Sequence, residues 1–470
     1  MKRIFLNSIA VALLSTFACT ATAQELHSSY FMKTSMYRHQ MNPALLETPY
    51  IAMPMLGNVN VGTTGTNGMN TFLYKTQGND KYKLTTFMSP EVNASEFLGK
   101  LQDKTNLNLN VNMSLFSVGF RSFKGISVVE LNLRSNTSMS VPREMFEFMK
   151  TAGAKENYTI KDLNARTNSY MELAVGHSHQ IGSNWKVGGK LKFLIGVAYA
   201  DLKVDQLDLT MNDTNWKIKG NAQLSSAILK SDFKYEDDED AATFDSSRGG
   251  KKIKGIENVK GGVPGLGMAI DFGAAYKVES VEGLTVSAAL TDLGFIAWTD
   301  AKSASSKGDW TFDGFKNPIY ATGTNDGTNK LGDQFDAMRD DLKKMFSLYD
   351  DGKKSKTSGI GTTVTLGAEY VMPFYRNLSA GIVYSQRFGG VYSYSQTMLS
   401  ANIRPLKWIE ATLNASTTTE GWCCGGMLSF YTKGFNFFIG SDRFMGKMSK
   451  QGIPLNSLNG SVNFGINFPL

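Results

Sequence analysis

Three lysines in one run of alternating residues have the clearest potential to bind a ligand. Lys186, Lys190 and Lys192 have the same parity, so a β-strand would place all three side chains on one face. A row of ammonium groups is suited to contact a carboxylate or an anionic headgroup. Pairing with acidic side chains of the same interior is the alternative, because an unpaired charge in a narrow interior is costly.

Further charged residues stand on the corresponding face of neighbouring runs, and they carry both signs. They are Glu130, Arg134, Glu172, Asp271, Glu369 and Glu410. Charges of both signs on one face favour a network of ion pairs that hydrates and rigidifies the interior. Ligand binding by any one of these residues is the second interpretation.

Two histidines raise the question of metal binding or catalysis. His177 and His179 share a face, and residues 176–180 (GHSHQ) nearly spell the G-x-S-x-G nucleophile elbow of hydrolases. The fifth position is Gln instead of Gly, and the chain has four histidines in all. The acidic run 236–240 is interpreted as part of a solvated external loop. We therefore predict no catalytic residue, no metal site, no cofactor and no enzymatic activity.

Alternation of apolar and polar residues is the strongest structural signal in the chain. In residues 107–115 (LNLNVNMSL) every second residue is apolar, which is the pattern of a strand with one apolar face. The last nine residues, 462–470 (VNFGINFPL), repeat this pattern up to the terminus. Similar runs cover residues 129–133, 187–199, 268–276, 284–290, 364–372, 378–384, 409–415 and 435–439.

The connections between these runs alternate between short and long. Short turns are predicted at residues 123–125, 182–185, 279–283, 373–377, 404–406 and 432–434. Long connections are predicted at residues 64–106, 141–168, 212–261 and 299–358. This asymmetry is typical of outer-membrane barrels, which have short periplasmic turns and long external loops.

We predict an all-β fold, a transmembrane antiparallel β-barrel formed by residues 51–470. The barrel would have about fourteen strands, and its last strand would pair with its first, so that no edge faces lipid. The external loops would carry short helices, among them one over residues 331–349, where apolar residues recur at helical spacing. The alternative is a soluble β-sandwich, which also alternates but needs fewer strands.

The first 23 residues predict an exported protein. Lys2 and Arg3 precede an apolar run, and small residues precede the expected cleavage between Ala23 and Gln24, which together describe a secretory signal peptide. Cys19 suggests a lipoprotein as the alternative, although Thr16 stands where a lipobox has Leu or Val. No later segment has the roughly 20 continuous apolar residues of a membrane helix.

Several segments resemble an outer-membrane barrel family of Bacteroidota type whose function is uncharacterised. The segments are residues 35–62 (SMYRHQMNPALLETPYIAMPMLGNVNVG), 188–196 (GGKLKFLIG), 267–276 (GMAIDFGAAY), 287–298 (SAALTDLGFIAW) and 400–410 (SANIRPLKWIE). That family is distantly similar to FadL-type long-chain fatty-acid transporters. The resemblance implies that residues 24–50 fold into the lumen as a plug, with Asn42, Pro43 and Ala44 on the lumen wall.

The resemblance also implies a function, namely the binding or transport of a hydrophobic small molecule. The alternative is a non-transporting structural or interaction barrel, such as a surface scaffold or a component of a secretion system. The expected location is the outer membrane of a Gram-negative bacterium, and the expected partners are its lipid, the barrel-insertion machinery and a hydrophobic ligand. The 49 basic and 42 acidic residues are spread along the chain, which predicts no nucleic-acid partner.

Overall fold

The computed structural model describes most of the chain. The described residues are 27–52, 56–66, 68–75, 84–151, 154–211, 216–235, 251–312, 348–390, 393–444 and 460–470. The predicted signal peptide with its cleavage site at Ala23 and Gln24, the acidic run 236–240, and residues 331–347 of the predicted loop helix lie outside these ranges. Among the described helices, none has the length and apolar character needed to cross a membrane.

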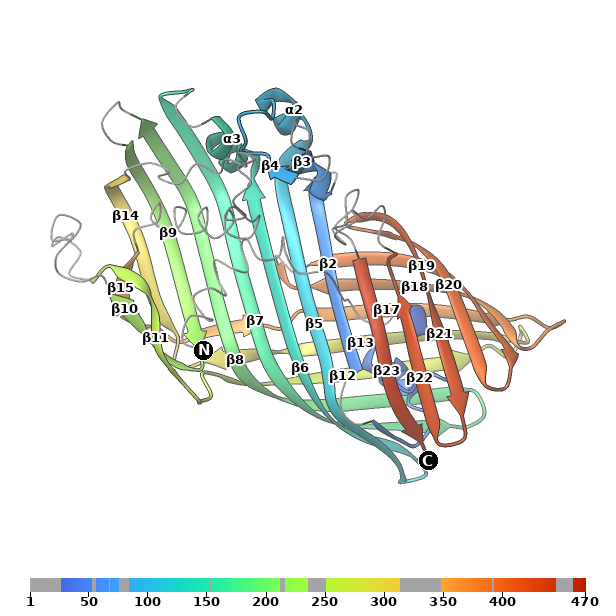
Figure 1. Ribbon diagram of the computed structural model, residues 1–470. Helices are drawn as coiled ribbons and strands as arrows, with labels where there is room; N and C mark the ends of the chain where they lie inside the picture. Colours follow the sequence, from blue (N-terminus) through green and yellow to red (C-terminus); the bar gives the residue numbers. More distant parts are fainter. Residues whose placement is uncertain are drawn as a thin grey trace, which may run out of the picture.

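The molecule is a closed antiparallel β-barrel of fourteen strands (Figure 1). Its wall consists of β1 (Tyr50–Ala52), β2 (Leu56–Thr66), β5 (Leu101–Ser122), β6 (Gly125–Pro142), β7 (Asn157–Ile181), β8 (Trp185–Met211), β9 (Trp216–Ile228), β12 (Leu266–Lys277), β13 (Leu284–Trp298), β14 (Lys302–Phe312), β15 (Tyr349–Lys353), β16 (Lys356–Gly359), β17 (Thr362–Val371), β18 (Leu378–Phe388), β19 (Tyr394–Leu406), β20 (Ile409–Thr418), β21 (Gly421–Thr432), β22 (Phe435–Ser441) and β23 (Gly460–Pro469).

Some positions in the wall are occupied by several short strands in succession. β9 and β12 both pair with β8, since Ile228 is opposite Ala198 and Leu266 is opposite Ile195. They therefore form one interrupted wall strand, from which the hairpin of β10 (Lys230–Tyr235) and β11 (Ile253–Lys260) leaves. β1 with β2, β13 with β14, and β15 with β16 and β17 are composite in the same way.

The final strand closes the barrel, as the alternation at the C-terminus predicts. β23 pairs with β22 on one side and with β1 and β2 on the other. Val462 is opposite Val59, and Phe468 is opposite Ile51. Every backbone group of a closed sheet can pair within the wall, which is the condition for a sheet to cross lipid.

The two ends of the barrel differ. At one end, which we call the turn end, short connections join β5 to β6, β7 to β8, β12 to β13, β17 to β18, β19 to β20 and β21 to β22. The other end, the loop end, carries α2 (Ala94–Gly99), α3 (Arg143–Thr151) and the hairpin of β3 (Leu73–Lys75) and β4 (Leu84–Thr86). The C-terminus lies away from these helices, at the turn end (Figure 1).

An apolar belt surrounds the outside of the barrel. It includes the exposed side chains of Leu173, Val175, Leu191, Phe193, Met268, Phe272, Phe295, Leu366, Ile382, Leu399, Leu413, Leu428, Ile439, Phe464 and Ile466. Exposed aromatic residues at the turn end border it, among them Phe123, Trp185, Phe374, Tyr375, Trp408 and Phe435. An apolar belt with an aromatic girdle is the surface that a barrel presents to a bilayer.

The strands from β5 to β9 rise beyond this belt toward α2 and α3 (Figure 1). All four predicted long connections are partly strand, because β5 begins at Leu101, β7 at Asn157, β9 at Trp216 and β14 at Lys302. In β8, Lys192 points inward and Phe193 outward, but the pairing with β7 shifts by one residue at Val197, so Tyr199 and Lys203 continue the inward face and Val204 continues the outward face. Val204 is buried and Lys203 is exposed, so the outward face of the protruding part is apolar and covered.

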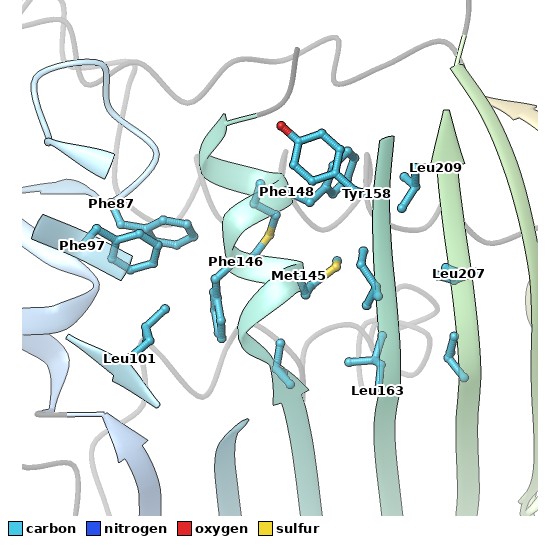
Figure 2. Packing of buried hydrophobic residues seen from close by; sticks show 14 of the residues in the cluster. Phe87, Phe97, Leu101, Met145, Phe146, Phe148, Tyr158, Leu163, Leu207 and Leu209 are labelled. Carbon is cyan, nitrogen blue, oxygen red and sulfur yellow. The ribbon is translucent and has the colours of Figure 1, made fainter. Parts of the chain in front are cut away.

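A packed apolar core covers the face of this protruding part that points away from the lumen (Figure 2). Met145, Phe146 and Phe148 of α3 pack there with aliphatic residues of β7, β8 and β9. Phe87 and Phe97 stack at a centroid distance of 4.4 Å beside α3. The core thus holds α2 and α3 against the wall.

Candidate functional site

The N-terminal segment, residues 27–52, lies against the inner wall of the barrel. It forms the 3₁₀ turns η2 (His27–Ser29), η3 (Arg38–Gln40) and η4 (Pro43–Leu45) before it joins the wall as β1. Its buried apolar side chains are Tyr30, Phe31, Met32, Met36, Tyr37, Met41, Ala44, Leu45, Leu46, Tyr50 and Ala52. They pack against inward-facing residues of several wall strands, so the segment lies inside the barrel, against its inner wall.

Two wall carboxylates hold the backbone of the segment. Glu410 of β20 accepts hydrogen bonds from the N–H groups of Lys33 and Thr34, at 3.1 and 2.8 Å, and from the Thr34 hydroxyl at 2.6 Å. Asp442, which follows β22, accepts from the N–H groups of His27 and Ser28 at 3.1 and 2.8 Å. Carboxylates satisfy backbone donors that would otherwise be buried without partners.

A third anchor is built around His39, which is completely buried. Lys190 Nζ lies 2.7 Å from His39 Nδ1 and 3.1 Å from Glu130 Oε2. Because an ammonium group only donates, Nδ1 accepts, and a neutral ring then carries its proton on Nε2. His39 Nε2 lies 2.7 Å from the Tyr50 hydroxyl and 3.2 Å from Glu130 Oε1.

The Asn42-Pro43-Ala44 turn lies against the wall where β8 and β12 are adjacent. Pro43 biases the preceding residue toward an extended conformation, and Asn42 has φ −151° and ψ 107°. The Asn42 amide donates to the carbonyl oxygens of two wall residues and to the Tyr30 hydroxyl. The wall has Gly188 and Gly273 here, and a Cβ on either would overlap Pro43 or Asn42.

A charged layer crosses the lumen next to the segment. It consists of Arg134, Glu172, Lys192, Asp271 and Asp292, all from wall strands. Lys192 Nζ lies 2.7 Å from Asp271 Oδ2 and 2.5 Å from Asp292 Oδ1. Arg134 lies 2.9 Å from Asp292 and 3.0 Å from Glu172.

The three lysines of β8 therefore do not form one anion site. Lys192 belongs to the charged layer, Lys190 holds His39, and Lys186 pairs with Glu47 of the N-terminal segment. Each ammonium group has a carboxylate partner, which is the pairing expected of charges in a narrow interior. Glu369 stands apart from these pairs, buried in β17 with Oε1 making no hydrogen bond.

On the loop side of the charged layer one sector of the interior, lined by β7, β8, β9, β12 and β13, is apolar. We call these residues the apolar cluster: Tyr170, Leu194, Tyr199, Ala227, Ala269, Ile296, Trp298, Ala301 and Ile360. The Trp298 ring stacks on Tyr199 at a centroid distance of 5.2 Å, and its indole N–H donates to Ser358 Oγ at 2.8 Å. Trp298 is completely buried, so its ring lies at the centre of this cluster, shielded from solvent.

Sequence reasoning missed four residues that matter in the lumen. His39 and Tyr50 lie in or beside a segment without periodicity, and no strand pattern indicates which way they point. Asp292 interrupts the alternation of β13 with a φ of 58°, a left-handed conformation that Asp tolerates better than most residues. Asp442 directly follows the last residue of β22. A polar residue at that place is interpreted from the sequence as the end of the strand, so its contact with the N-terminal segment is not expected.

The histidine pair on β7 makes a ring contact and one hydrogen bond to a neighbouring strand. The His177 and His179 rings stack at a centroid distance of 6.0 Å, and His177 Nδ1 lies 2.9 Å from Ser127 Oγ. Cys423 and Cys424 of β21 are unbridged thiols. Within the described ranges no group of three or more His, Cys, Asp and Glu side chains has the geometry to hold a metal ion.

Comparison with known proteins identifies a family and a shared fold. A model described as "Family of unknown function (DUF5723)" matches residues 43–442. No curated protein matches the chain. Each structural similarity below has low sequence identity, so it concerns the fold alone.

Three solved structures are similar in fold along nearly their whole length. The Pseudomonas putida toluene transporter TodX has 8% identity and a TM-score of 0.36, with 93% of each chain covered. The Ralstonia pickettii toluene transporter TbuX has 10% identity and a TM-score of 0.39, with 96% of this chain and 95% of that chain covered. A Pseudomonas aeruginosa FadL homologue has 10% identity and a TM-score of 0.34, with 91% of each chain covered.

Proposed function

The chain belongs to the Family of unknown function (DUF5723), and we propose that it binds or transports a hydrophobic small molecule in the outer membrane of a Gram-negative bacterium. In this proposal the apolar belt lies in the bilayer, the turn end faces the periplasm and the loop end faces outward. The proposal includes no catalytic step and no cofactor.

The observation that carries the proposal is the change of the interior from charged to apolar. A channel for hydrophilic solutes is lined by polar side chains and filled with water. Beyond Lys192 on β8, however, the inward side chains are those of the apolar cluster around Trp298 and Ile296. Apolar surface is favourable for a hydrophobic solute and unfavourable for an ion. This sector of the loop-side lumen therefore suits a hydrophobic ligand.

The anchoring of the N-terminal segment supports a gated function. The segment packs on the inner wall in the turn-side half, and its anchors each pair one group of the segment with one group of the wall. A passage through the barrel requires the segment to move, in the manner of a lid. In the resting state the barrel would not leak small hydrophilic solutes.

The test is transfer of a hydrophobic fluorescent probe, N-phenyl-1-naphthylamine, into liposomes that contain the folded protein. Ile360 is almost completely buried in the apolar cluster, so Ile360→Asn should reduce protein-dependent transfer at least fivefold. Ile360→Val keeps the site apolar and is the matched control. The proposal would be refuted if the unmodified protein did not increase transfer of the probe. It would also be refuted if the two variants transferred the probe equally well.

Closure is tested by removing residues 26–48. The shortened protein should fold as a heat-modifiable barrel, and in planar bilayers its single-channel conductance should exceed that of the intact protein. Equal conductance would mean that the N-terminal segment does not close the lumen.

A structural or interaction barrel is the second candidate, and the packed core at the loop end favours it. The strands that protrude beyond the belt carry aromatic and aliphatic residues packed around α3 (Figure 2), which would make a platform outside the bilayer. This candidate predicts that the hydrophobic probe is not transferred and that the interior stays closed in all variants above.

A further inference from the structure

A cavity of about 500 Å³ opens at the turn end, beside the N-terminal segment. Its walls come from the segment and from three connections, those between β7 and β8, β12 and β13, and β17 and β18. This volume lies in the range of about 300–1,000 Å³ that is usual for small-molecule sites. The cavity is separate from the apolar cluster, since they share no residue.

Arg38 is the most unusual group of this cavity. Its side chain is 7% exposed, and Nε is buried without a hydrogen-bond partner. Among the described residues its closest acidic atom is Glu47 Oε2, at 3.8 Å, which is too long for a hydrogen bond. A buried guanidinium with unused donors is costly, and its planar fork matches a carboxylate or a phosphate.

The other charges of the cavity leave it positive. Arg376 pairs with Glu282 at 2.9 Å, and Lys186 pairs with Glu47. Lys33 and Lys277 also line the cavity, and neither has an acidic partner within the described part of the chain. Two lysines and Arg38 therefore face a single remaining carboxylate, that of Glu369. The balance favours an anion.

Polar and apolar side chains form the rest of the lining. The polar ones are Gln180, Ser183, Asn184, Thr285 and Ser287. Tyr30 and Phe31 meet edge to face, with centroids 5.0 Å apart, but both are almost completely buried. The accessible apolar surface therefore comes mainly from Val278, Leu284, Val371, Met372 and Pro373. A ligand that satisfies both Arg38 and this surface has one anionic group and one apolar body.

We infer that the cavity at the turn end binds the anionic group, a carboxylate or a phosphate monoester, of a small amphiphile, and that Arg38 is the main residue that contacts this group. The inference goes beyond the proposed function, from which it takes only that the turn end faces the periplasm. It does not require passage through the apolar cluster.

Strand pairing sets the orientation of the bound amphiphile. Lys186 lies on β8 and Glu369 on β17, and β12 and β13 separate these strands. Three strand spacings put the two residues roughly 14 Å apart along the wall. The Glu369 carboxylate repels the anionic group, so this group lies on the side of Arg38 and Lys186, and the apolar body extends toward β17.

Glu47 acts as an internal competitor for the same cations. Burial alone would raise the pKa of the Glu47 carboxyl, but Arg38 and Lys186 together lower this pKa below its ordinary value. Glu47 is therefore ionised at neutral pH, and it offsets part of the attraction between these cations and an incoming anion. Its removal should strengthen binding.

The test is calorimetric titration of the full-length mature protein in detergent with four probes: octanoate, octyl phosphate, 1-octanol and octylammonium. Matched chain length holds the apolar contribution constant, and titration of empty micelles corrects for partitioning. We expect octanoate or octyl phosphate to bind at least tenfold more tightly than octanol, and octylammonium to bind most weakly. The relative affinities of the two anions identify the headgroup.

Three variants locate the site. Arg38→Gln should weaken binding of the anion at least tenfold, and Arg38→Lys should give an intermediate loss because the fork is missing. Glu47→Gln should instead strengthen binding two- to fivefold. The opposite sign keeps the test informative even where Arg38→Gln reduces the yield of heat-modifiable barrel.

Several results would overturn the inference. Equal affinities for octanoate and octanol would remove the role of the anion, and tight binding of octylammonium would assign the site to the acidic residues. An unchanged affinity in Arg38→Gln would place the anion elsewhere. Inorganic phosphate that binds as tightly as octyl phosphate would exclude the apolar body. None of these outcomes depends on probe transfer, so this inference and the proposed function can fail separately.

Discussion

A single charge placed on the outside of β8 tests the assignment of the apolar belt. Phe193 is 47% exposed and points away from the lumen, where its partners in the neighbouring strands are the belt residues Leu173 and Met268. Trp185, at the turn end, is eight residues away, roughly 26 Å along the strand and 20 Å along the barrel axis at a tilt of about 40°. Phe193 should therefore lie within the bilayer, well away from the turn-end girdle.

Replacement of Phe193 by Arg should strongly destabilise the inserted barrel. An Arg on the lipid face near the midplane costs about 2–4 kcal/mol, which corresponds to a roughly 30- to 700-fold change in the folding equilibrium. The matched control is Gln206→Arg, which adds the same side chain on the same strand at another exposed position. Gln206 lies 13 residues farther, roughly 33 Å along the axis, and a surface change of this kind costs within about 0.5 kcal/mol.

The measurement is the free energy of unfolding from urea titrations of protein folded into liposomes, followed by heat modifiability on gels. Linear extrapolation compares the two variants with the unmodified protein. Equal losses for Phe193→Arg and Gln206→Arg would refute the reasoning, because they would mean that both positions have the same environment. The protruding part of the wall would then have to lie in lipid as well.

Three further predictions concern the lumen. Lys192→Met leaves buried carboxylates without their cation and should lower the free energy of unfolding by about 3–5 kcal/mol, measured by the same titration. Gly273→Val should displace the N-terminal segment and raise single-channel conductance, while Gly189→Ala, where an added Cβ meets only ordinary contacts, should leave conductance unchanged. Burial, followed by the charge of Lys190, lowers the pKa of His39 from 6.5 to about 3. Between these pH values His39 takes up a proton only when the segment is displaced, so docking of the segment weakens as the pH falls from about 6.5. Channel openings should therefore become more frequent at lower pH. The variant His39→Gln should not show this pH dependence.

The architecture of the barrel could be predicted because its signal is local. Alternation at residues 107–115 and 462–470 identifies the lipid and lumen faces strand by strand, and the predicted closure of the barrel is confirmed by the pairing of β23 with β1 and β2. The protruding parts of β7 and β9 were missed for a physical reason. Register shifts at Val197 and Asp205 change which parity faces the lumen, so the alternation that marks a membrane strand does not continue through them.

The candidate site could be predicted only in part. The parity of Lys192 and Asp271 indicates that both point inward, but which ion pairs they form depends on the register between strands far apart in sequence. Asp292 escapes the pattern because its left-handed backbone breaks the alternation. His39 and Arg38 lie outside any strand, so neither the strand period nor the helix period indicates where their side chains point. Their partners are determined only by the fold of the lumen.

The charged layer and the N-terminal segment differ in what holds them, and this difference leads to a last prediction. Every member of the layer comes from the wall, whereas each anchor of the segment has one partner in the segment. Removal of residues 26–48 should therefore leave the layer in place as the narrowest part of the lumen. Three carboxylates, Glu172, Asp271 and Asp292, face two cations there, so the layer has a net negative charge. The opened barrel should select cations.

The reversal potential in a tenfold KCl gradient measures this selectivity directly. The shortened barrel should prefer K⁺ over Cl⁻, and the added variant Asp292→Asn should reduce the preference because it balances the charges of the layer. Lys192→Met in the same background should increase the preference. The shortened barrel could instead show no ion selectivity, or a selectivity that neither substitution alters. Either result would mean that the charged layer rearranges when the segment is removed. In that case the segment, and not the pairing of charges within the wall, maintains the order of the lumen.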